Sequence, residues 1–332
     1  MIHPIPPGTR DVLPDEMREL RRLRATLIDA FEARGYGEVA TPAIEYAEVL
    51  ARGGGRPAED AYRFFGEDGE LLALRSDMTV PIARLVAGRY AGAEQPIRLC
   101  YVADTYRVVR PQRGQMREVS QAGVELIGGP AARGTVEVIE VLEAALDAAG
   151  LDRAVIGLGD ADLFHHLLAE LGVGEEERSR VLARLATHDL VGIEDELAQA
   201  AGLAEAQIET CLALAQLRGG REVLRRAREL AGGAVERAIA RIEETYLELE
   251  ARGAAERVLI DLGLLRDLGY YSGAILEVYD PALGDIIGGG GRYDGLLRRF
   301  GLDLPAAGFA LDLQRVHVAQ MEAEARRAEA AR

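Results

Sequence analysis

The feature that most constrains this chain is a pair of strand-like runs within residues 106–129, joined by a basic loop at residues 110–114. Side chains along a strand alternate between its two faces, so a strand over residues 117–127 places Arg117, Gln121 and Glu125 on one face. The same rule groups three residues of the preceding run, which are Thr105, Arg107 and Val109. The two runs therefore predict a β-hairpin with one polar face.

This polar face has two interpretations. An edge hairpin that faces solvent carries polar side chains without further meaning. A buried face must instead pair its polar groups or present them to a ligand, because an unpaired polar group is costly away from water. The residues by themselves leave both interpretations open.

The chain is acidic, with 55 aspartates and glutamates against 39 basic residues and a net charge of -16. A nucleic-acid-binding protein needs a basic face to neutralise phosphates, so we expect no nucleic-acid partner. The sequence also contains no lysine. This excludes Schiff-base chemistry and the lysine of a P-loop, and it leaves arginine as the fixed cation.

Two further features indicate the compartment. Cys100 and Cys211 lie far apart in apolar runs, which predicts buried free thiols in a reducing environment. No apolar run reaches the roughly 18 residues of a membrane-spanning helix, and residues 1–11 lack the apolar region of a signal peptide. We therefore expect a cytoplasmic protein with no membrane partner.

Local patterns predict the elements that precede the hairpin. Pro14 is followed by apolar residues at helical spacing as far as Gly35, which predicts a long amphipathic helix. Apolar runs on both sides of a Gly-Glu-Asp-Gly turn predict a second hairpin over residues 62–74. Asp77 and Thr79 stand just before another helical run, where either residue suits the N-cap.

The composition changes within residues 162–252, where alanine, leucine, glutamate and arginine dominate and no convincing strand pattern is found. This predicts an inserted helical subdomain, while residues 1–161 and 253–332 form the core. His165 and His166 are adjacent and cannot share one helical face, so we expect no metal site.

The hairpin also carries the residues of a known motif. These residues are Arg107, Arg110, Pro111, Gln112, Gly114, Arg117, Gln121 and Glu125. The run resembles motif 2 of class II aminoacyl-tRNA synthetases, and most closely that of histidyl-tRNA synthetases. Residues 265–273 are similar to the histidine-specific segment of that family, residues 288–295 to its Gly-Gly-Arg-Tyr-Asp-Gly run, and residues 308–315 to its motif 3.

The resemblance implies an α+β fold of the class II aminoacyl-tRNA synthetase catalytic core, a mostly antiparallel sheet flanked by helices. In this chain the small helical subdomain is inserted into that core. Residues 35–46 are similar to motif 1, whose proline is Pro42 here and lies at the dimer interface of the family. The resemblance therefore also implies a dimeric core.

The resemblance assigns an amino-acid pocket to six residues, which are Asp77, Thr79, Gln121, Glu125, Tyr270 and Tyr271. Asp77, Thr79 and Gln121 would hold the α-amino group, because an ammonium needs acceptors. Glu125 and Tyr271 would contact the imidazole, whose N–H needs a carboxylate or a phenol. The implied ligand is L-histidine, and Glu125 is the residue expected to select it.

The nucleotide site of the family is altered in this chain. Arg107, Arg266 and Arg315 match its arginines and keep a cationic anion site or vestigial nucleotide site. Val109 replaces a glutamate of motif 2 and cannot accept a hydrogen bond. Asp312 replaces a glycine of motif 3 and would repel a triphosphate by on the order of 1 to 4 kcal/mol at about 4 Å. We therefore expect no catalysis and no bound cofactor.

We also expect no anticodon-binding domain after motif 3. A histidine pocket without a working nucleotide site resembles the regulatory subunits of ATP phosphoribosyltransferase. That family implies a non-catalytic protein of histidine biosynthesis that activates a short-form catalytic subunit and transmits feedback inhibition by histidine, within a hetero-octamer. Two alternatives remain open. One is a truncated histidine-activating, adenylate-forming ligase, and the other is a scaffold with a vestigial pocket.

Overall fold

The computed structural model describes residues 4–54, 60–109, 115–200, 202–266 and 269–330. Over these residues, nine strands form one large sheet in the order β1-β5-β6-β12-β11-β10-β7-β9-β8, and three strands form a small sheet in the order β2-β4-β3. Neighbours in the large sheet are antiparallel except for β1 with β5 and β7 with β9. The predicted mostly antiparallel α+β core is confirmed.

The strands of the large sheet are β1 (Gly37–Glu38), β5 (Ile97–Tyr106), β6 (Glu118–Ile127), β7 (Val155–Asp160), β8 (Arg218–Gly219), β9 (Val258–Asp261), β10 (Ala274–Asp280), β11 (Asp285–Arg292) and β12 (Ala306–Asp312). Those of the small sheet are β2 (Ile44–Tyr46), β3 (Arg63–Phe65) and β4 (Leu71–Leu74). The core helices are α1 (Pro14–Glu32), α2 (Ala47–Gly53), α4 (Thr79–Arg89), α5 (Ala131–Ala148), α12 (Leu313–Ala330) and the short 3-10 helix η2 (Leu297–Phe300).

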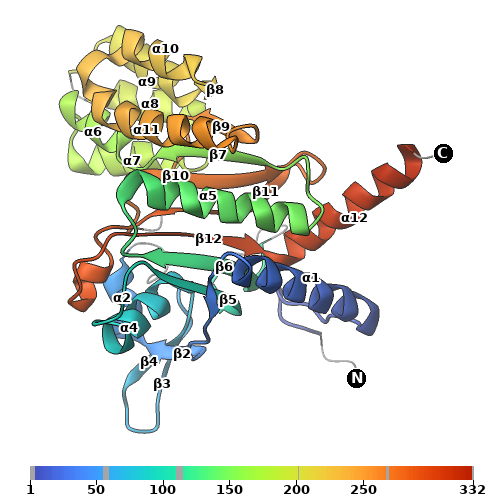
Figure 1. Ribbon diagram of the computed structural model, residues 1–332. Helices are drawn as coiled ribbons and strands as arrows, with labels where there is room; N and C mark the ends of the chain where they lie inside the picture. The colour runs from blue at the N-terminus through green and yellow to red at the C-terminus, as the bar shows by residue number, and fades with distance from the viewer. Residues whose placement is uncertain (1–3, 55–59, 110–114, 201, 267–268, 331–332) are drawn as a thin grey trace.

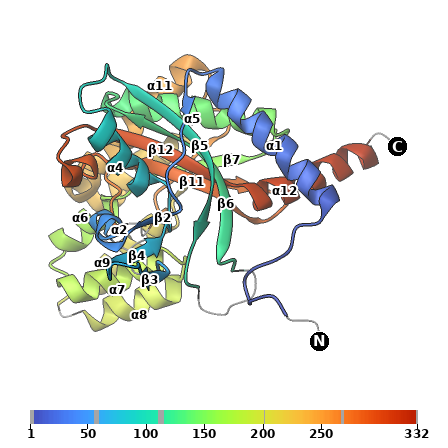
Figure 2. The same ribbon diagram turned by 90° about the horizontal axis from the view of Figure 1, so that it is seen from below.

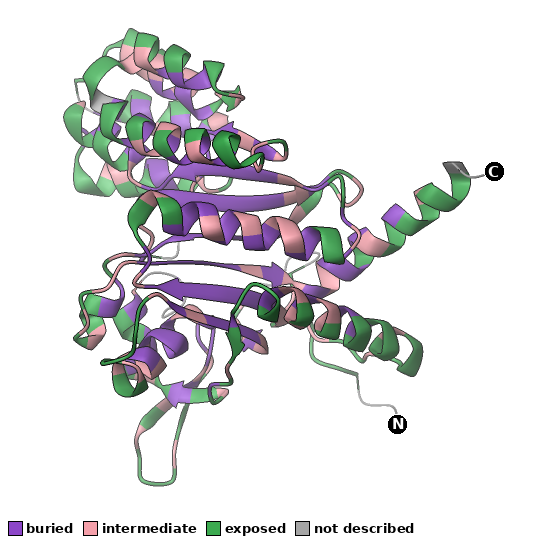
Figure 3. Ribbon diagram, in the orientation of Figure 1, coloured by how far each residue is buried: buried purple, intermediate pink, exposed green. Residues whose placement is uncertain are grey.

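The large sheet has one apolar face, which packs against helices. Helices α1 and α5 lie side by side across it, with the insertion helix α11 (Glu236–Arg252) beyond α5 (Figures 1 and 2). Val124 of β6, Leu276 of β10 and Phe309 of β12 point into this layer and are buried there. The helical surfaces turned away from the sheet are exposed, whereas the central strands of the large sheet are mostly buried (Figure 3).

The opposite face is covered by α2, α4, η2 and the small sheet, and a second apolar cluster lies beneath them. Residues of β5 divide between the two faces because strand side chains alternate. Cys100 joins the first cluster, while Leu99 and Tyr101 join the second. The second face is the one that carries Glu125, because Glu125 pairs with Leu99 across the β5–β6 ladder.

Helix α1 shows how local sequence sets an element. Pro14 occupies the first turn, where its missing N–H costs nothing, and Asp15 and Glu16 complement the positive end of the helix. Buried residues then repeat at helical spacing, and these are Leu20, Leu23, Leu27 and Phe31. The predicted amphipathic helix is confirmed, and so is the predicted β3–β4 hairpin.

The predicted hairpin within residues 106–129 is also confirmed, as β5 and β6, but the first strand is shorter than expected. Strand β5 ends at Tyr106, so the prediction that Arg107 and Val109 continue it was wrong. The physical reason is a change of hydrogen-bond partner, because the N–H of Val108 donates to the carbonyl of Asp60 at 2.7 Å rather than to β6. The connecting loop, with Arg110, Pro111, Gln112 and Gly114, lies outside the described residues.

Helices fill the described part of residues 162–252, as the composition predicts. These elements are α6 (Leu163–Glu170), α7 (Glu175–Leu185), α8 (Leu190–Gln199), α9 (Glu205–Ala215), α10 (Glu222–Ala231), the 3-10 helix η1 (Gly232–Val235) and α11. The expectation of no strand was wrong, since Arg218 and Gly219 form β8 and pair with β9 at the sheet edge. A strand of two residues is too short to leave an alternating pattern.

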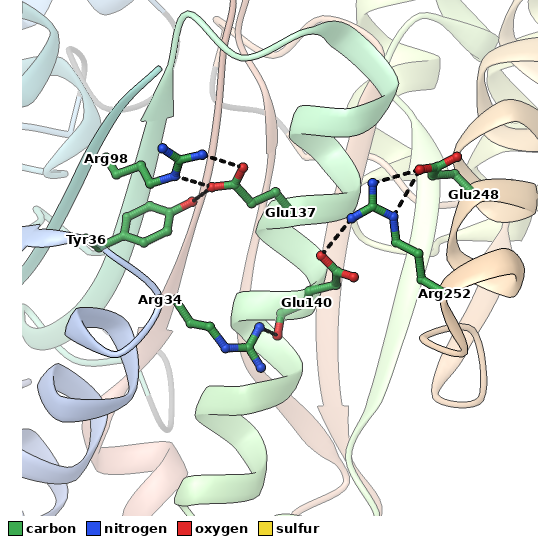
Figure 4. A network of polar contacts seen from close by, with 7 residues as sticks. All are labelled: Arg34, Tyr36, Arg98, Glu137, Glu140, Glu248 and Arg252. Carbon is green, nitrogen blue, oxygen red and sulfur yellow. Dashed lines mark hydrogen bonds and ion pairs between the residues drawn. The ribbon is translucent and has the colours of Figure 1, made fainter. Parts of the chain in front are cut away.

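Helix α5 connects the two ends of the fold through its carboxylates (Figure 4). Glu137 accepts hydrogen bonds from Arg98 of β5 at 2.6 and 3.0 Å and from the Tyr36 hydroxyl at 3.1 Å. One turn further, Glu140 forms an ion pair with Arg252 of α11 at 3.3 Å. The N-terminal layer and the insertion are thus both held to the same helix.

The glycine run of β11 leaves no room for side chains, which makes Gly290 a test of the sheet packing. A Cβ atom there would lie 2.1 Å from the carbonyl oxygen of Gly308 and 2.6 Å from Cα of Phe309. We expect Gly290→Ala to lower the free energy of unfolding by about 1 to 3 kcal/mol, because overpacking forces the backbone to move. Urea denaturation measures the change. Gly295→Ala is the control, because a Cβ there meets no atom within 4 Å; equal losses in both variants would contradict the argument.

Candidate functional site

The floor of the candidate site is built by β6 and its neighbour β12. Gln121 and Glu125 point to the same face, and Asp312 and Gly308 of β12 lie opposite them in the ladder. Gly308 is needed beside Glu125, since a Cβ there would come within 2.0 Å of the carboxylate. Gly123, between the two polar residues, leaves space for the Tyr101 hydroxyl in the same way. The glycines therefore make the recess that holds the polar groups.

Glu125 is the most deeply placed of the predicted site residues, with 1% of its surface exposed. The Thr79 hydroxyl donates to its Oε1 at 2.8 Å, and the Tyr293 hydroxyl donates to its Oε2. Burial raises the pKa of Glu125 to about 8, although both hydrogen bonds act in the opposite direction. Near neutral pH this side chain is a protonated acid that can both donate and accept.

Asp77 combines a structural role with an unused acceptor. Its Oδ1 accepts a hydrogen bond from the backbone N–H of Val80 at 2.9 Å, which satisfies a free donor at the start of α4. Its Oδ2 is buried and has no hydrogen-bond partner among the described residues. Burial raises the pKa of Asp77, and the nearby Arg107 guanidinium opposes that rise. The N-cap residue itself is Met78, so the prediction that Asp77 or Thr79 occupies that position was wrong by one residue, although the Asp77 side chain still accepts from the first turn. One carboxylate oxygen of Asp77 remains available to a ligand.

Three tyrosines form the wall of the site. The rings of Tyr270 and Tyr271 meet edge to face with centroids 5.1 Å apart, and Tyr270 meets Tyr293 in the same way at 6.0 Å. Burial raises the pKa of Tyr271 to about 12, and the carboxylates of Glu125 and Asp77 add to that rise. All three phenols are therefore neutral at physiological pH.

The structure thus brings most of the predicted pocket together from distant parts of the chain. Thr79 comes from α4, Glu125 from β6, and Tyr270 and Tyr271 from the segment before β10. Gln121 is half-buried and lies four residues from Glu125, two strand repeats, on the same face. The role of each residue toward a ligand stays a prediction at this point.

The predicted anion site has the same arginines, but their charges are offset. Arg266 lies 3.5 Å from the Glu277 carboxylate, and Arg315 lies 3.2 Å from the Asp285 carboxylate and 3.5 Å from that of Asp312. In addition, Nη1 of Arg315 donates to a backbone carbonyl of β11 at 2.5 Å. Two of the three arginines are therefore ion-paired within the chain.

Arg107 has a different environment from the other two arginines. Its Nε donates to the carbonyl oxygen of Ser76 at 2.8 Å, next to Asp77. Burial raises the pKa of both Asp77 and Asp312, and Arg107 lies close enough to oppose that rise at both carboxyl groups. Arg107 therefore attracts both the Asp77 carboxyl group in the pocket and the Asp312 carboxyl group at the end of β12.

Asp312 has a structural function that the sequence alone did not reveal. Its Oδ1 accepts a hydrogen bond from the backbone N–H of Arg315 at 3.1 Å, so it caps the start of α12. The same carboxylate faces the Arg315 side chain. A negative charge thus occupies the helix terminus that otherwise suits an anionic ligand.

Sequence reasoning missed Tyr293 and Tyr101 as site residues. Tyr293 donates to Glu125 although 168 positions separate the two residues in the chain. The available signal was its place in the Gly-Gly-Arg-Tyr-Asp-Gly run of residues 288–295. Tyr101 left no such signal, because it reads as an apolar position in a buried strand.

The described residues also bear on metal sites, reactive thiols and membrane spans. Across the described ranges, no group of three or more histidines, cysteines, aspartates or glutamates is placed to hold a metal ion. Cys100 and Cys211 are buried free thiols, as predicted. None of the helices that the structure describes is long and apolar enough to span a membrane.

The arrangement matches known proteins over almost the whole chain. The sequence model of the histidyl-tRNA synthetase family matches residues 8–316. A solved structure from Bacillus halodurans, titled as an ATP phosphoribosyltransferase regulatory subunit/histidyl-tRNA synthetase, superposes with a TM-score of 0.86 at 32% identity, over 96% of this chain and 84% of that one. The fold and the site therefore define a protein of the class II, histidyl-tRNA synthetase type.

Sequence relatives give the narrower assignment. The chain is 43% identical to the ATP phosphoribosyltransferase regulatory subunit of Symbiobacterium thermophilum, over 98% of this chain and 82% of the relative. It is 41% identical to the protein of the same name from Moorella thermoacetica, over 96% of this chain and 82% of that relative. The chain belongs to the family of ATP phosphoribosyltransferase regulatory subunits. This confirms the predicted family and the prediction of a regulatory subunit rather than an enzyme.

The burial of Glu125 predicts a specific pH dependence of stability. Because its pKa is about 8 in the folded protein and 4.5 ordinarily, the folded state retains a proton that the unfolded state loses between these values. The contribution of Glu125 to the free energy of unfolding is therefore fully present below pH 4.5, and it is lost as the pH rises to about 8. We expect Glu125→Gln, which keeps the shape but cannot ionise, to remove up to about 1.4 kcal/mol per pH unit from this slope.

Urea denaturation at several pH values between 5 and 8, for the wild type and the variant, measures the two slopes. Buried acids that do not interact with Glu125, such as Glu143, contribute equally to both proteins. Identical slopes would show that Glu125 is ionised in the folded protein throughout this range.

Proposed function

We propose that this chain is the regulatory subunit of ATP phosphoribosyltransferase in histidine biosynthesis and that it binds L-histidine in the pocket of Asp77, Thr79, Gln121, Glu125, Tyr270 and Tyr271. In this proposal the chain activates a short-form catalytic subunit and transmits feedback inhibition by histidine. We also propose that the protein is cytoplasmic. The observation that carries the proposal is a buried pair of acidic groups, Asp77 and Glu125, with hydrogen-bonding capacity that the chain itself leaves unused.

The α-ammonium of histidine suits the Asp77 side of the pocket. The free Oδ2 of Asp77 is buried, and a buried acceptor without a donor costs about 1 to 3 kcal/mol. An ammonium carries three donors and would satisfy that oxygen together with the Thr79 hydroxyl and the Gln121 amide oxygen. A bound cation would also stabilise the ionised form of Asp77, whose pKa burial raises.

The imidazole suits the Glu125 side. Each oxygen of Glu125 already accepts one hydroxyl hydrogen bond, but a protonated carboxyl group keeps acceptor capacity beyond these two bonds. A ring N–H can therefore still donate to it, while the Tyr271 phenol lies close enough to take part. Because this group titrates near pH 8, histidine binding in the pocket would change its protonation.

The altered nucleotide site supports a regulatory role over the rival ligase. Adenylate formation needs cationic side chains aimed at the phosphates as charge develops. Arg266 and Arg315 face Glu277, Asp285 and Asp312 instead, so part of their charge is offset before any substrate arrives. Turning Arg266 and Arg315 toward a nucleotide would break the ion pairs that they form in this structure.

Regulation requires that the complex exist in at least two states with different affinity for histidine, since a ligand shifts an equilibrium only by its differential affinity. We place the pocket in that role because it lies where α4, β6 and the segment before β10 meet. The inserted helices of residues 162–252 then form a separate subdomain attached to the core of residues 1–161 and 253–332.

The central prediction is direct binding of L-histidine to the purified chain. Isothermal titration calorimetry should detect it in the wild type, and Glu125→Ala should abolish it because the imidazole loses its partner and the recess loses its shape. Glu118→Gln is a matched control, since Glu118 lies on the same strand but is exposed. A wild type that does not bind histidine would favour the scaffold with a vestigial pocket.

The same preparation separates regulation from catalysis. Copurified with a short catalytic subunit, the chain should make phosphoribosyl transfer sensitive to histidine, and the Glu125→Ala complex should lose that sensitivity. Histidine-dependent pyrophosphate exchange by the isolated chain should be absent. A clear exchange signal would instead establish the truncated ligase.

We further propose that the chain forms a dimeric core within a hetero-octamer. Three aromatic or aliphatic side chains of the small sheet are exposed on one face, with Ile44 at 49%, Tyr46 at 53% and Phe64 at 37%. Tyr46 and Phe64 both lie beside Leu72 of β4, so they form a continuous apolar surface. An exposed apolar patch of this kind favours association with a partner surface.

The dimer is tested by a pair of neighbouring residues with opposite orientations. Phe64→Glu places a charge on the apolar face and should shift the protein from dimer to monomer in light-scattering chromatography. Phe65→Glu is the control, because Phe65 points to the other face and is 76% exposed. A monomeric wild type, or equal dissociation by both variants, would contradict this interface.

A further inference from the structure

Helix α11 of the insertion contacts the core through two ion pairs, in addition to the β8–β9 pairing at the sheet edge. Near its C-terminal end, Arg252 pairs with Glu140 of α5 and Glu248 of its own helix on the surface (Figure 4). Nearer its N-terminal end, Arg241 reaches the end of β7. The two contacts differ in burial, because the partner of Arg252 is partly exposed whereas the carboxylate of Asp160 is fully buried.

The Arg241 contact is a bidentate ion pair. Nε of Arg241 donates to Oδ2 of Asp160 at 2.8 Å and Nη2 donates to Oδ1 at 2.7 Å, while Nη2 also reaches Asp162 at 3.1 Å. A planar guanidinium matches a carboxylate in this two-bond geometry, which fixes orientation as well as distance. Asp160 is a core residue held by a side chain of the insertion.

Asp160 is part of the support beneath Tyr271. It pairs with Ala274 in the β7–β10 ladder, and the next residue, Ala161, donates its N–H to the carbonyl of Gly273 at 2.7 Å. The Tyr271 ring packs against a small apolar cluster of Ala161, Leu264 and Ile275. Arg241 itself runs past Gly273, where a Cβ would lie 3.7 Å from its Nε. Movement of Arg241 therefore displaces the residues that carry Tyr271.

We propose that Arg241 is a positioning residue that couples the helical insertion to the histidine pocket, so that displacement of the insertion changes the affinity for histidine. This inference rests on the proposed function of the pocket. The link is short and continuous: Arg241 holds Asp160, the neighbouring Ala161 holds Gly273, and Ala161 also packs against Tyr271. A partner that binds the insertion could act on the pocket through this link.

The Arg241–Asp160 ion pair is costly to break, because the Asp160 carboxylate is buried. Removing one member of a buried pair leaves an uncompensated charge, so Asp160 must follow Arg241 or become protonated. Burial raises the pKa of Asp160, and Arg241 is what opposes that rise. Separation of the two groups therefore leaves Asp160 either charged without its arginine partner or protonated.

The test compares histidine affinity by calorimetry in four proteins, which are the wild type, Arg241→Gln, Arg252→Gln and the double variant Asp160→Asn/Arg241→Gln. We expect Arg241→Gln to bind about tenfold more weakly, within the usual range of coupling between sites. Arg252→Gln removes the other attachment of the same helix and should bind as the wild type does. The double variant leaves no unpaired buried charge, so it separates stability from coupling.

The outcomes discriminate clearly. A double variant that regains thermal stability yet still binds weakly supports the coupling, and one that regains both shows that Arg241 is only structural and overturns it. Equal weakening by Arg252→Gln also overturns it. Absence of binding in the wild type would defeat the proposed function itself. In that case amide hydrogen exchange over residues 269–276 still tests the contact between Arg241 and the Tyr271 segment. If the contact holds this segment, exchange is faster in Arg241→Gln than in Arg252→Gln.

Discussion

The structure depends on the burial of one acidic side chain, Glu125, at a position of the sheet whose nearest neighbours on the same face, Leu99 and Gly308, are apolar or glycine. The group is tolerated because Thr79 and Tyr293 donate to its two oxygens and because burial keeps it protonated near neutral pH. Gly308 supplies the space beside it. The helix α4, the hairpin and the loop after β11 are therefore held in place by a polar centre rather than by apolar packing alone.

This polar centre divides the sheet into two functional sides. The side covered by α1 and α5 is a continuous apolar layer that also reaches the insertion, and it stabilises the fold. The opposite side holds Glu125, Asp77 and the tyrosines, so acceptors and phenols face a common space. A protein of this type retains the shape of an activating enzyme while Arg266 and Arg315 are offset by carboxylates.

Much of this site was predictable because it follows from period-two alternation and from short motifs. The four-residue spacing of Gln121 and Glu125 puts both on one face of any strand, whatever the strand pairs with. The end of β5 was not predictable, because it depends on a hydrogen bond between Val108 and Asp60 of a separate segment. The pairing of Arg315 with Asp285 likewise needs β11 and β12 to be neighbours in the sheet.

The sequence by itself therefore determined the class of fold, the family and the residue types of the pocket, because local periodicity and motif spacing are carried by adjacent positions. Only the tertiary structure decided that Tyr293 meets Glu125, that Asp312 caps α12 and faces Arg315, and that Arg241 holds Asp160. The Tyr293 and Arg241 contacts join residues 168 and 81 positions apart. Side chains that distant meet only when the order of strands in the sheet is set, and no local pattern encodes that order.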